Sequence, residues 1–293
     1  MDRHNKKSSV ATATEALHKI TALRMEGVID LARENSFTFI GQVVNVPIVL
    51  LNEESNNYRI TFTLLVVRRN GRTDYPKINV YDLSEQEARD YVQMMRPGVF
   101  AIIRGMIATS VVKKPVRCEI CGQISKIDTL HTEVISFGKP YVMKEKPDPK
   151  DISEFSNRGI VLGSLCSEVF RRDGANGGPA AQFQLAISRR YHTKDMKLEN
   201  RTDYPWVKVF GDTALQCLKR LRKSAQIYAS CAFQTRDVMR HVKCEHCENL
   251  LVYEERVGEL VPNDVEFLNQ CMFEYKVKPE REDSGEGAVN EEI

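Results

Sequence analysis

The sequence lacks any apolar run that approaches the roughly 18 residues of a membrane-spanning helix, and its first 13 residues hold no apolar segment of the kind found in secretion signals. It also contains no phosphate-binding P-loop, no nucleophile elbow and no paired carboxylates that form a recognisable site. These absences predict a soluble, cytoplasmic protein that is not an enzyme.

The sequence also lacks a large excess of charge of one sign, because 42 lysines and arginines nearly balance 40 aspartates and glutamates. The balance is uneven, since residues 279–293 carry a net charge of −5 and leave +7 for the rest of the +2 total. A basic body indicates an anionic partner and an acidic tail a solvated segment, although a frayed terminus explains the tail equally well. The length of 293 residues suits two globular domains.

Three sequence blocks occur twice in the same order. They are a strand-like block ending in Arg-Arg at 62–69 and 183–190, the pentapeptide RTDYP at 72–76 and 201–205, and CExC at 118–121 and 244–247. The offsets are 121, 129 and 126 residues, which is the size of a domain rather than of a solenoid repeat. We infer that one ancestral module was duplicated and fused.

The two modules show the same order of predicted elements. In module one we expect strands at 37–44, 59–69, 77–81, 99–106 and 132–136, with a helix at 84–95 that Ser84 and Glu87 cap. In module two we expect strands at 159–163, 182–188, 206–210, 226–233 and 250–257, with a helix at 212–221. This order predicts an all-β dominated fold of two tandem five-stranded OB-fold barrels, each with a short helix.

The expected domain boundaries follow from these elements. They are an N-terminal disordered segment and helix at 1–34, module one at 35–143, a charged, proline-broken linker at 144–157, module two at 158–275 and a disordered acidic tail at 276–293.

Module two resembles the bacterial single-stranded DNA-binding protein family. The resemblance lies in five segments: 157–163 (NRGIVLG), 181–188 (AQFQLAIS), 201–211 (RTDYPWVKVFG), 223–230 (KSAQIYAS) and 234–236 (QTR). It implies OB folds that bind and protect single-stranded DNA in replication, recombination or repair, with localisation at the nucleoid. Family members assemble four OB folds, which implies a homodimer of this chain.

Aromatic positions of the family fall on Tyr191, Tyr204 and Phe210 in module two and on Tyr75 and Tyr81 in module one. The single tryptophan, Trp206, extends this set, because period-two alternation puts Tyr204, Trp206, Lys208 and Phe210 on one strand face. The alternative is that Phe210 and Tyr81 belong to the barrel cores. Exposed aromatic rings of this kind suit stacking of unpaired bases.

Basic residues accompany these aromatics in both modules, and we expect them to contact phosphates. They are Arg68, Arg69, Arg72 and Lys77 in module one, and Arg189, Arg190, Arg201, Lys208 and Arg236 in module two. An arginine pair is usually solvated surface, but recurrence at the same place in both modules favours a role in binding. Asn70 stands where module two has Tyr191, so we expect module two to be the stronger binder.

The cysteine pairs Cys118/Cys121 and Cys244/Cys247 have the spacing of zinc knuckles, each offering two of the four ligands of a structural zinc ion. They fall between the fourth and fifth strands of each module. If the modules pack about a pseudo-twofold axis, as the resemblance to the family implies, we expect the two pairs to meet in one shared zinc site with four cysteine ligands. Separate sites completed by His131, His241 or His246, and no metal at all, are the alternatives. The resemblance gives no support here, because zinc ligands are not part of the family's usual pattern.

Three other functions remain open at this point. The chain suits an OB-fold subunit that binds structured RNA, a protein-interaction subunit of a replication or recombination complex, or a thiol oxidoreductase that uses CxxC. The acidic tail resembles the partner-recruiting tail of the family in charge, but it ends in Glu291-Glu292-Ile293 rather than in an acidic-Pro-Phe tip. The host element, whether chromosome, plasmid, phage or conjugative element, is not evident from the sequence.

Overall fold

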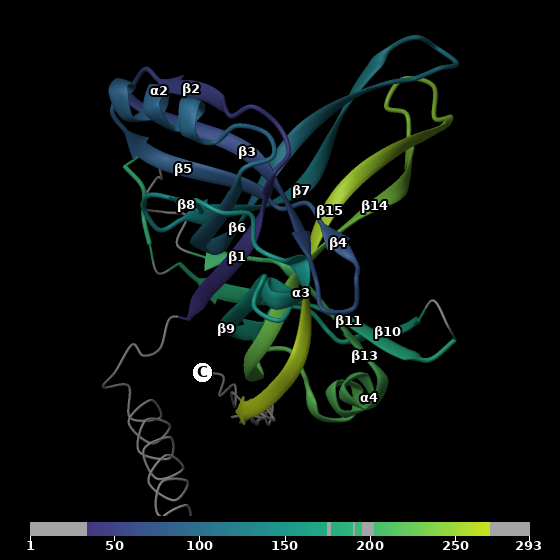
Figure 1. The fold of residues 1–293 in the computed structure, drawn as a ribbon. Coiled ribbons are helices and arrows are strands. Elements are labelled where there is room, and N and C mark those ends of the chain that lie inside the picture. The colour runs from purple at the N-terminus through teal and green to yellow at the C-terminus, as the bar shows by residue number, and fades with distance from the viewer. Residues whose placement is uncertain (1–33, 175–176, 190, 195–201, 270–293) are drawn as a thin grey trace, which may run out of the picture.

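The computed structural model describes residues 34–174, 177–189, 191–194 and 202–269 (Figure 1). The expected N-terminal helix and the acidic tail lie outside the described residues. None of the described helices is long and apolar enough to cross a membrane.

A first group of strands is closed on itself by backbone pairing. Its elements are β1 (Asn35–Val43), β2 (Ile48–Asn52), β3 (Asn57–Val67), β4 (Thr73–Asp74), β5 (Lys77–Leu83), α2 (Glu85–Met94), β6 (Phe100–Arg117), β7 (Ile124–Ser136) and β8 (Tyr141–Val142). Pairing runs from β1 through β3, β5, β7 and β6 back to β1, and only the β5–β7 pair is parallel. These five strands form the first barrel.

The second barrel repeats this arrangement after the short helix α3 (Pro149–Ile152). Its elements are β9 (Asn157–Leu165), β10 (Phe170–Asp173), β11 (Pro179–Ser188), β12 (Thr202–Asp203), β13 (Trp206–Phe210), α4 (Gly211–Arg220), β14 (Gln226–Lys243) and β15 (Leu250–Asn269). Pairing runs from β9 through β11, β13, β15 and β14 back to β9, and the β13–β15 pair is again parallel. The predicted pair of OB folds is confirmed.

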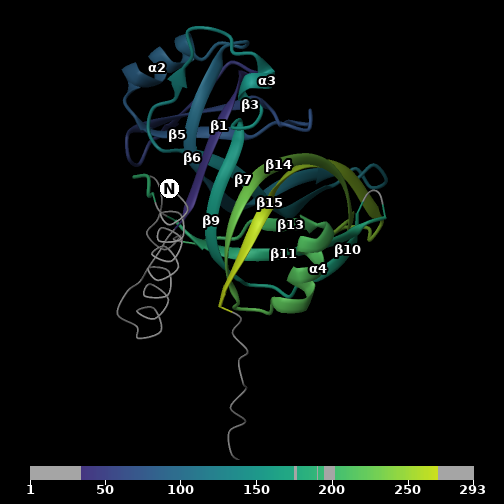
Figure 2. The same ribbon diagram turned by 60° about the horizontal axis from the view of Figure 1, so that its bottom comes forward.

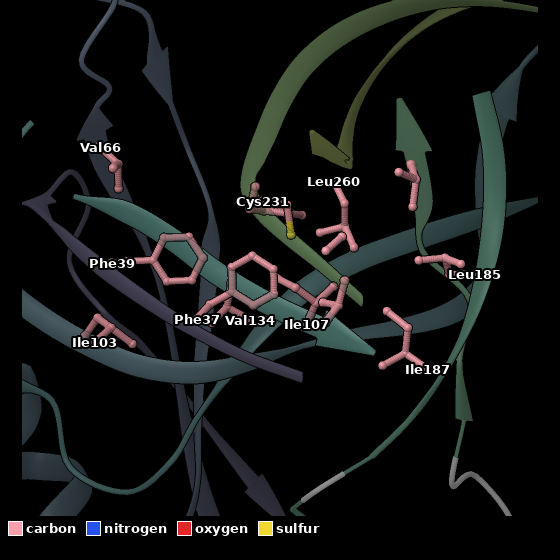
Figure 3. Packing of buried hydrophobic residues seen from close by; sticks show 14 of the residues in the cluster. Phe37, Phe39, Val66, Ile103, Ile107, Val134, Leu185, Ile187, Cys231 and Leu260 are labelled. Carbon is pink, nitrogen blue, oxygen red and sulfur yellow. The ribbon is translucent and has the colours of Figure 1, made fainter. Parts of the chain in front are cut away.

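The first strands of the two barrels pair with each other. β1 and β9 run antiparallel from Asn35 opposite Val161 to Phe39 opposite Asn157, which puts α2 and α4 at opposite ends of the molecule (Figure 2). Phe37 lies opposite Gly159, where its ring occupies the space that a Cβ atom would need. Buried apolar side chains of both barrels therefore form one continuous core, part of which Figure 3 shows.

The elements agree with the predicted order, and α2 begins at the predicted capping box. Ser84 accepts a hydrogen bond from the Glu87 amide, and the Glu87 carboxylate accepts one from the Ser84 amide at 2.9 Å. This exchange, together with the Lys139 ammonium 3.0 Å away, lowers the pKa of Glu87 to about 2. The predicted helix start is therefore confirmed.

The strands differ from the expectation in several places. β6 and β14 each continue about one strand length beyond the predicted ends, to Arg117 and Lys243, and with β7 and β15 they form two long hairpin arms that extend from the barrels (Figure 1). The short strands β2 and β10 were not predicted, and each adds to the second strand of its barrel.

Candidate nucleic-acid interface

The outer face of β13 carries the aromatic residues that alternation predicts. Val207 and Val209 are buried in the core, whereas Trp206 and Lys208 are half-buried and Phe210 is 42% exposed. The alternative that Phe210 belongs to the core is therefore wrong. Period-two geometry puts the three outward side chains on one face of the strand.

Strand register extends this face over β11 and β10. Two rows of paired residues cross the three strands: Phe170, Gln182 and Lys208 in one row, and Arg172, Ala180 and Phe210 in the next. Tyr204 is 45% exposed beside them, and its carbonyl oxygen accepts a hydrogen bond from Gln184, which lies opposite Trp206. We call this set the aromatic face; it consists of Phe170, Arg172, Gln182, Gln184, Tyr204, Trp206, Lys208 and Phe210.

Cations and aromatic rings alternate on the aromatic face. Lys208 Nζ lies 5.5 Å from the centre of the Phe210 ring, and Arg172 Cζ lies 6.0 Å from the centre of the Phe170 ring. Each of these two rings therefore has a positive charge beside it, so groups suited to bases and to phosphates lie close together. The sequence pattern did not reveal Phe170 and Arg172; the only local signal was an aromatic residue and two arginines just before a glycine-rich stretch at residues 174–178.

Two other predicted aromatic residues, Tyr81 and Tyr191, are engaged with protein neighbours. Tyr81 is half-buried, and its hydroxyl accepts a hydrogen bond from Arg59, whose guanidinium also lies 5.6 Å from the ring centre. Tyr191 crosses from the second barrel to pack edge-on against Phe137 at 5.9 Å between ring centres. Lys77 is exposed at the start of β5.

The RTDYP motif of the second barrel forms a buried polar contact with the first barrel. Asp203 is fully buried and accepts two hydrogen bonds of 2.8 Å from the Arg189 guanidinium. It also accepts one of 2.7 Å from the backbone amide of Thr109 on β6. The Thr109 hydroxyl in turn accepts a hydrogen bond of 2.8 Å from the amide of Tyr204.

The RTDYP motif of the first barrel mirrors this contact. Asp74 is fully buried, lies 2.7 Å from Arg68 Nε and accepts hydrogen bonds from the side-chain amide of Asn157 and the backbone amide of Thr235. Both donors belong to the second barrel. The repeated aspartates therefore join the two barrels, and we call these contacts the aspartate locks.

The aspartate locks change the interpretation of two predicted phosphate contacts. The side chains of Arg68 and Arg189 are only 14% and 7% exposed, and each is paired with the motif aspartate of its own barrel. A charge that is buried and neutralised in this way is not available to a phosphate group. We therefore remove both arginines from the candidate interface.

The remaining predicted residues have varied surroundings. Arg69 and Arg72 are exposed on the turn between β3 and β4, and the half-buried Tyr75 ring lies 5.1 Å from the Arg256 guanidinium. Arg236 donates two hydrogen bonds to Glu259. Arg190 and Arg201 lie outside the described residues.

The four predicted cysteine ligands meet at the tips of the two arms. Cys118 and Cys121 are in the turn between β6 and β7, Cys244 and Cys247 are in the turn between β14 and β15, and all four sulfur atoms lie within 4.8 Å of one another. Among the described residues, this cysteine cluster is the one group of three or more side chains that could hold a metal ion. The histidines of the alternative with separate sites are not part of such a group.

The distances between sulfurs of opposite arms are 3.7 Å from Cys118 to Cys247 and 3.8 Å from Cys121 to Cys244. Four thiolates that each lie about 2.3 Å from one tetrahedral zinc ion are about 3.8 Å apart, so the cluster has the dimensions of a zinc site with four cysteine ligands. The amide of His246 and the hydroxyl of Ser125 lie near the Cys244 sulfur and lower the pKa of that thiol to about 6.

Comparison with known proteins gives a family match for the second barrel. A profile described as the single-strand binding protein family matches residues 156–258. Through this segment, the second barrel is similar to the single-strand binding protein family. The segment includes the whole aromatic face, so the family match and the geometry of the interface concern the same residues.

Individual members of the family have limited overlap with this chain. Single-stranded DNA-binding protein 1 of Chlorobaculum tepidum is 30% identical over 80 residues, which are 27% of this chain and 49% of that protein. The chain therefore spans about half the length of this curated relative. The single-stranded DNA binding protein of Thermus aquaticus, in wild-type and deletion-mutant crystal structures, has a TM-score of 0.53 at 13% identity. The match covers 80–81% of this chain and 94–96% of the Thermus chain, and it confirms the fold across both barrels.

Proposed function

We propose that the protein binds and protects single-stranded DNA without sequence preference. The observation that carries this proposal is the aromatic face, where exposed or half-exposed Trp206 and Phe210 flank Lys208 inside the segment that matches the family. Bases would stack on the rings while Lys208 and Arg172 contact phosphates. The names of the relatives, which describe single-stranded DNA-binding proteins, support the same function.

The choice of a single strand follows from the chemistry of this face. Flat rings at a protein surface stack on bases whose faces are free, and in a duplex those faces are covered by neighbouring base pairs. Exposed Tyr204 would add a further ring, and Arg69, Arg72, Lys77 and Tyr75 would extend the contacts onto the first barrel. Arg190, Arg201 and Arg236 remain candidates for phosphate contacts.

Titration of fluorescein-labelled oligo-dT tests this proposal directly, because Trp206 is the single tryptophan and reports on the aromatic face alone. We expect strong quenching of Trp206 and an affinity that falls steeply as salt is raised from about 50 to about 300 mM, on the order of tenfold or more. A duplex of equal length serves as the control. Absence of binding at low salt would refute the function and favour the protein-interaction alternative, and preference for duplex RNA would favour the RNA-binding alternative.

We propose further that binding is passive and serves DNA replication, recombination or repair at the nucleoid in the cytoplasm. A homodimer would bring together four barrels, the number that family members assemble. The acidic tail would recruit replication or recombination proteins. Sedimentation of the free and DNA-bound protein measures the oligomeric state.

We also propose that the four clustered cysteines hold one structural zinc ion. Its chemistry would be to fasten the two arms, since each arm supplies two ligands. Around the sulfurs, Leu251 is buried, and Lys114 from the first arm donates to the Glu254 carbonyl and lies 4.6 Å from the Tyr253 ring. These contacts between the arms support the proposal that the two tips are held together.

Metal analysis of the purified protein tests the zinc proposal. We expect one zinc ion per chain, and Cys244→Ser should lower zinc content to near zero, because a structural site needs its four ligands. Cys166→Ser, at a half-buried cysteine outside the cluster, is the matched control and should keep the metal. Two zinc ions per chain would point to separate sites, and none in protein purified under reducing conditions would refute the proposal.

A further inference from the structure

The first barrel has a surface that corresponds residue by residue to the aromatic face. β2 pairs with β3 as β10 pairs with β11, so Ile48 opposite Thr61 matches Phe170 opposite Gln182, and Leu50 opposite Arg59 matches Arg172 opposite Ala180. In the next strand, Asn79 opposite Thr61 matches Lys208 opposite Gln182. We call this surface the leucine face; it consists of Ile48, Leu50, Arg59, Thr61, Asn79 and Tyr81.

The leucine face has lost the features that suit a nucleic acid. Aliphatic Ile48 and Leu50, 57% and 37% exposed, stand where the second barrel has a phenylalanine and an arginine. Asn79 replaces a lysine, is buried and donates a hydrogen bond to Glu133. Arg59 is held against the hydroxyl and ring of Tyr81.

A pocket of about 590 Å³ opens beside the leucine face. It is lined by Leu50, Leu51, Asn52, Glu53, Glu54, Arg59 and Tyr81. Glu53 and Glu54 are exposed in the turn between β2 and β3, whereas the corresponding stretch of the second barrel consists of glycine, alanine and asparagine. The pocket therefore joins an apolar wall to two carboxylates, which repel a phosphate backbone and attract a cation.

The free edge of β2 adds a second element of recognition. Within the part of the chain that the structure describes, β2 pairs with β3 alone, so one edge of this apolar strand has no strand partner. An extended peptide binds such an edge through its backbone, while alternate side chains enter neighbouring pockets.

We propose that the leucine face docks an extended peptide of a partner protein in which apolar and basic side chains alternate. The peptide backbone pairs with β2, an apolar side chain lies against Leu50 and the Tyr81 ring, and a lysine or arginine pairs with Glu53 or Glu54. The inference rests on the proposed function in one respect, because that function places the DNA on the second barrel. Tyr81 then belongs to the peptide site and not to the DNA interface.

Fluorescence polarisation with a labelled, acetylated Lys-Leu-Lys-Leu-Lys-Leu peptide tests the proposal on the full chain. We expect saturable binding. Leu50→Ser and the double variant E53Q/E54Q should each raise the Kd about tenfold. A Glu-Leu peptide and a Lys-Ser peptide of the same length should bind at least tenfold more weakly, because each lacks one of the two required chemistries.

The outcomes separate this inference from the proposed function. Leu50→Ser should leave oligo-dT affinity unchanged, since Leu50 lies outside the aromatic face, and its exposure allows the variant to fold. Equal affinity of the Lys-Leu peptide for wild type and both variants would overturn the inference. So would loss of oligo-dT binding in Leu50→Ser, which would mark a nucleic-acid surface, or loss of self-association, which would mark a contact between copies of this chain. Failure of oligo-dT to bind wild type would refute the proposed function alone.

Discussion

Replacing Asp203 by alanine is expected to lower the free energy of unfolding by about 3–5 kcal/mol, the cost of removing one partner from a buried ion pair. The carboxylate is fully buried and accepts hydrogen bonds from both the Arg189 guanidinium and the Thr109 amide. In the variant, the arginine stays buried without a counter-charge and the amide loses its acceptor. Urea denaturation followed by circular dichroism measures the change.

A matched exposed pair provides the control for this prediction. Asp237 accepts two hydrogen bonds of 2.8 Å from Arg256, but both side chains are about half exposed on the second arm. Asp237→Ala should leave stability nearly unchanged, because water replaces the lost partner. Asp74→Ala, in the first aspartate lock, should behave like Asp203→Ala. Equal, small losses in all three variants would show that the locks do not stabilise the joint between the barrels.

The aspartate locks also explain what the repeated pentapeptide could and could not predict. Repetition of RTDYP correctly marked equivalent places in two similar barrels. The expected role of Arg68 and Arg189, which lie in the block ahead of the pentapeptide, does not fit the structure, because an exposed phosphate contact and a buried ion pair both require an arginine. The aspartate of the pentapeptide was the available signal, but its surroundings depend on Thr109 for Asp203 and on Thr235 for Asp74. Each threonine comes from the opposite barrel and shows no local pattern.

Strand order and the start of α2 were predictable because alternation and the Ser84–Glu87 box are local features of the chain. The arms were not. Beyond the barrels, β6 and β7 pair with each other and expose both faces, so residues such as Val111 and Lys113 show no alternation of buried and exposed types. The meeting of the cysteine pairs was predicted from their equivalent positions and from pseudo-twofold packing of the modules. The length of the arms, which brings the pairs together, was not predicted.

Replacing Trp206 and Phe210 together by alanine is expected to weaken oligo-dT binding at least about thirtyfold. Each stacked base contributes about 1–3 kcal/mol as measured by alanine substitution, and two stacking positions lost together reach about 2 kcal/mol even at the lower limit. Polarisation of labelled oligo-dT measures the affinity, because the variant has no tryptophan signal. Both side chains point away from the core residues Val207 and Val209, so the variant should fold.

A salt series distinguishes the aromatic contribution from the ionic one. The double aromatic variant should keep the wild-type slope of log K against log salt, because it removes no phosphate contact. Lys208→Gln should instead reduce the slope by about 0.7, the value expected for one contact to a single strand. Tyr141→Ala, at a tyrosine that is 61% exposed on β8 of the first barrel, is the matched control and should bind as wild type does. If the double aromatic variant binds as wild type does while Tyr141→Ala loses affinity, the DNA does not bind on the aromatic face, and the proposed path of the strand must be moved to the first barrel.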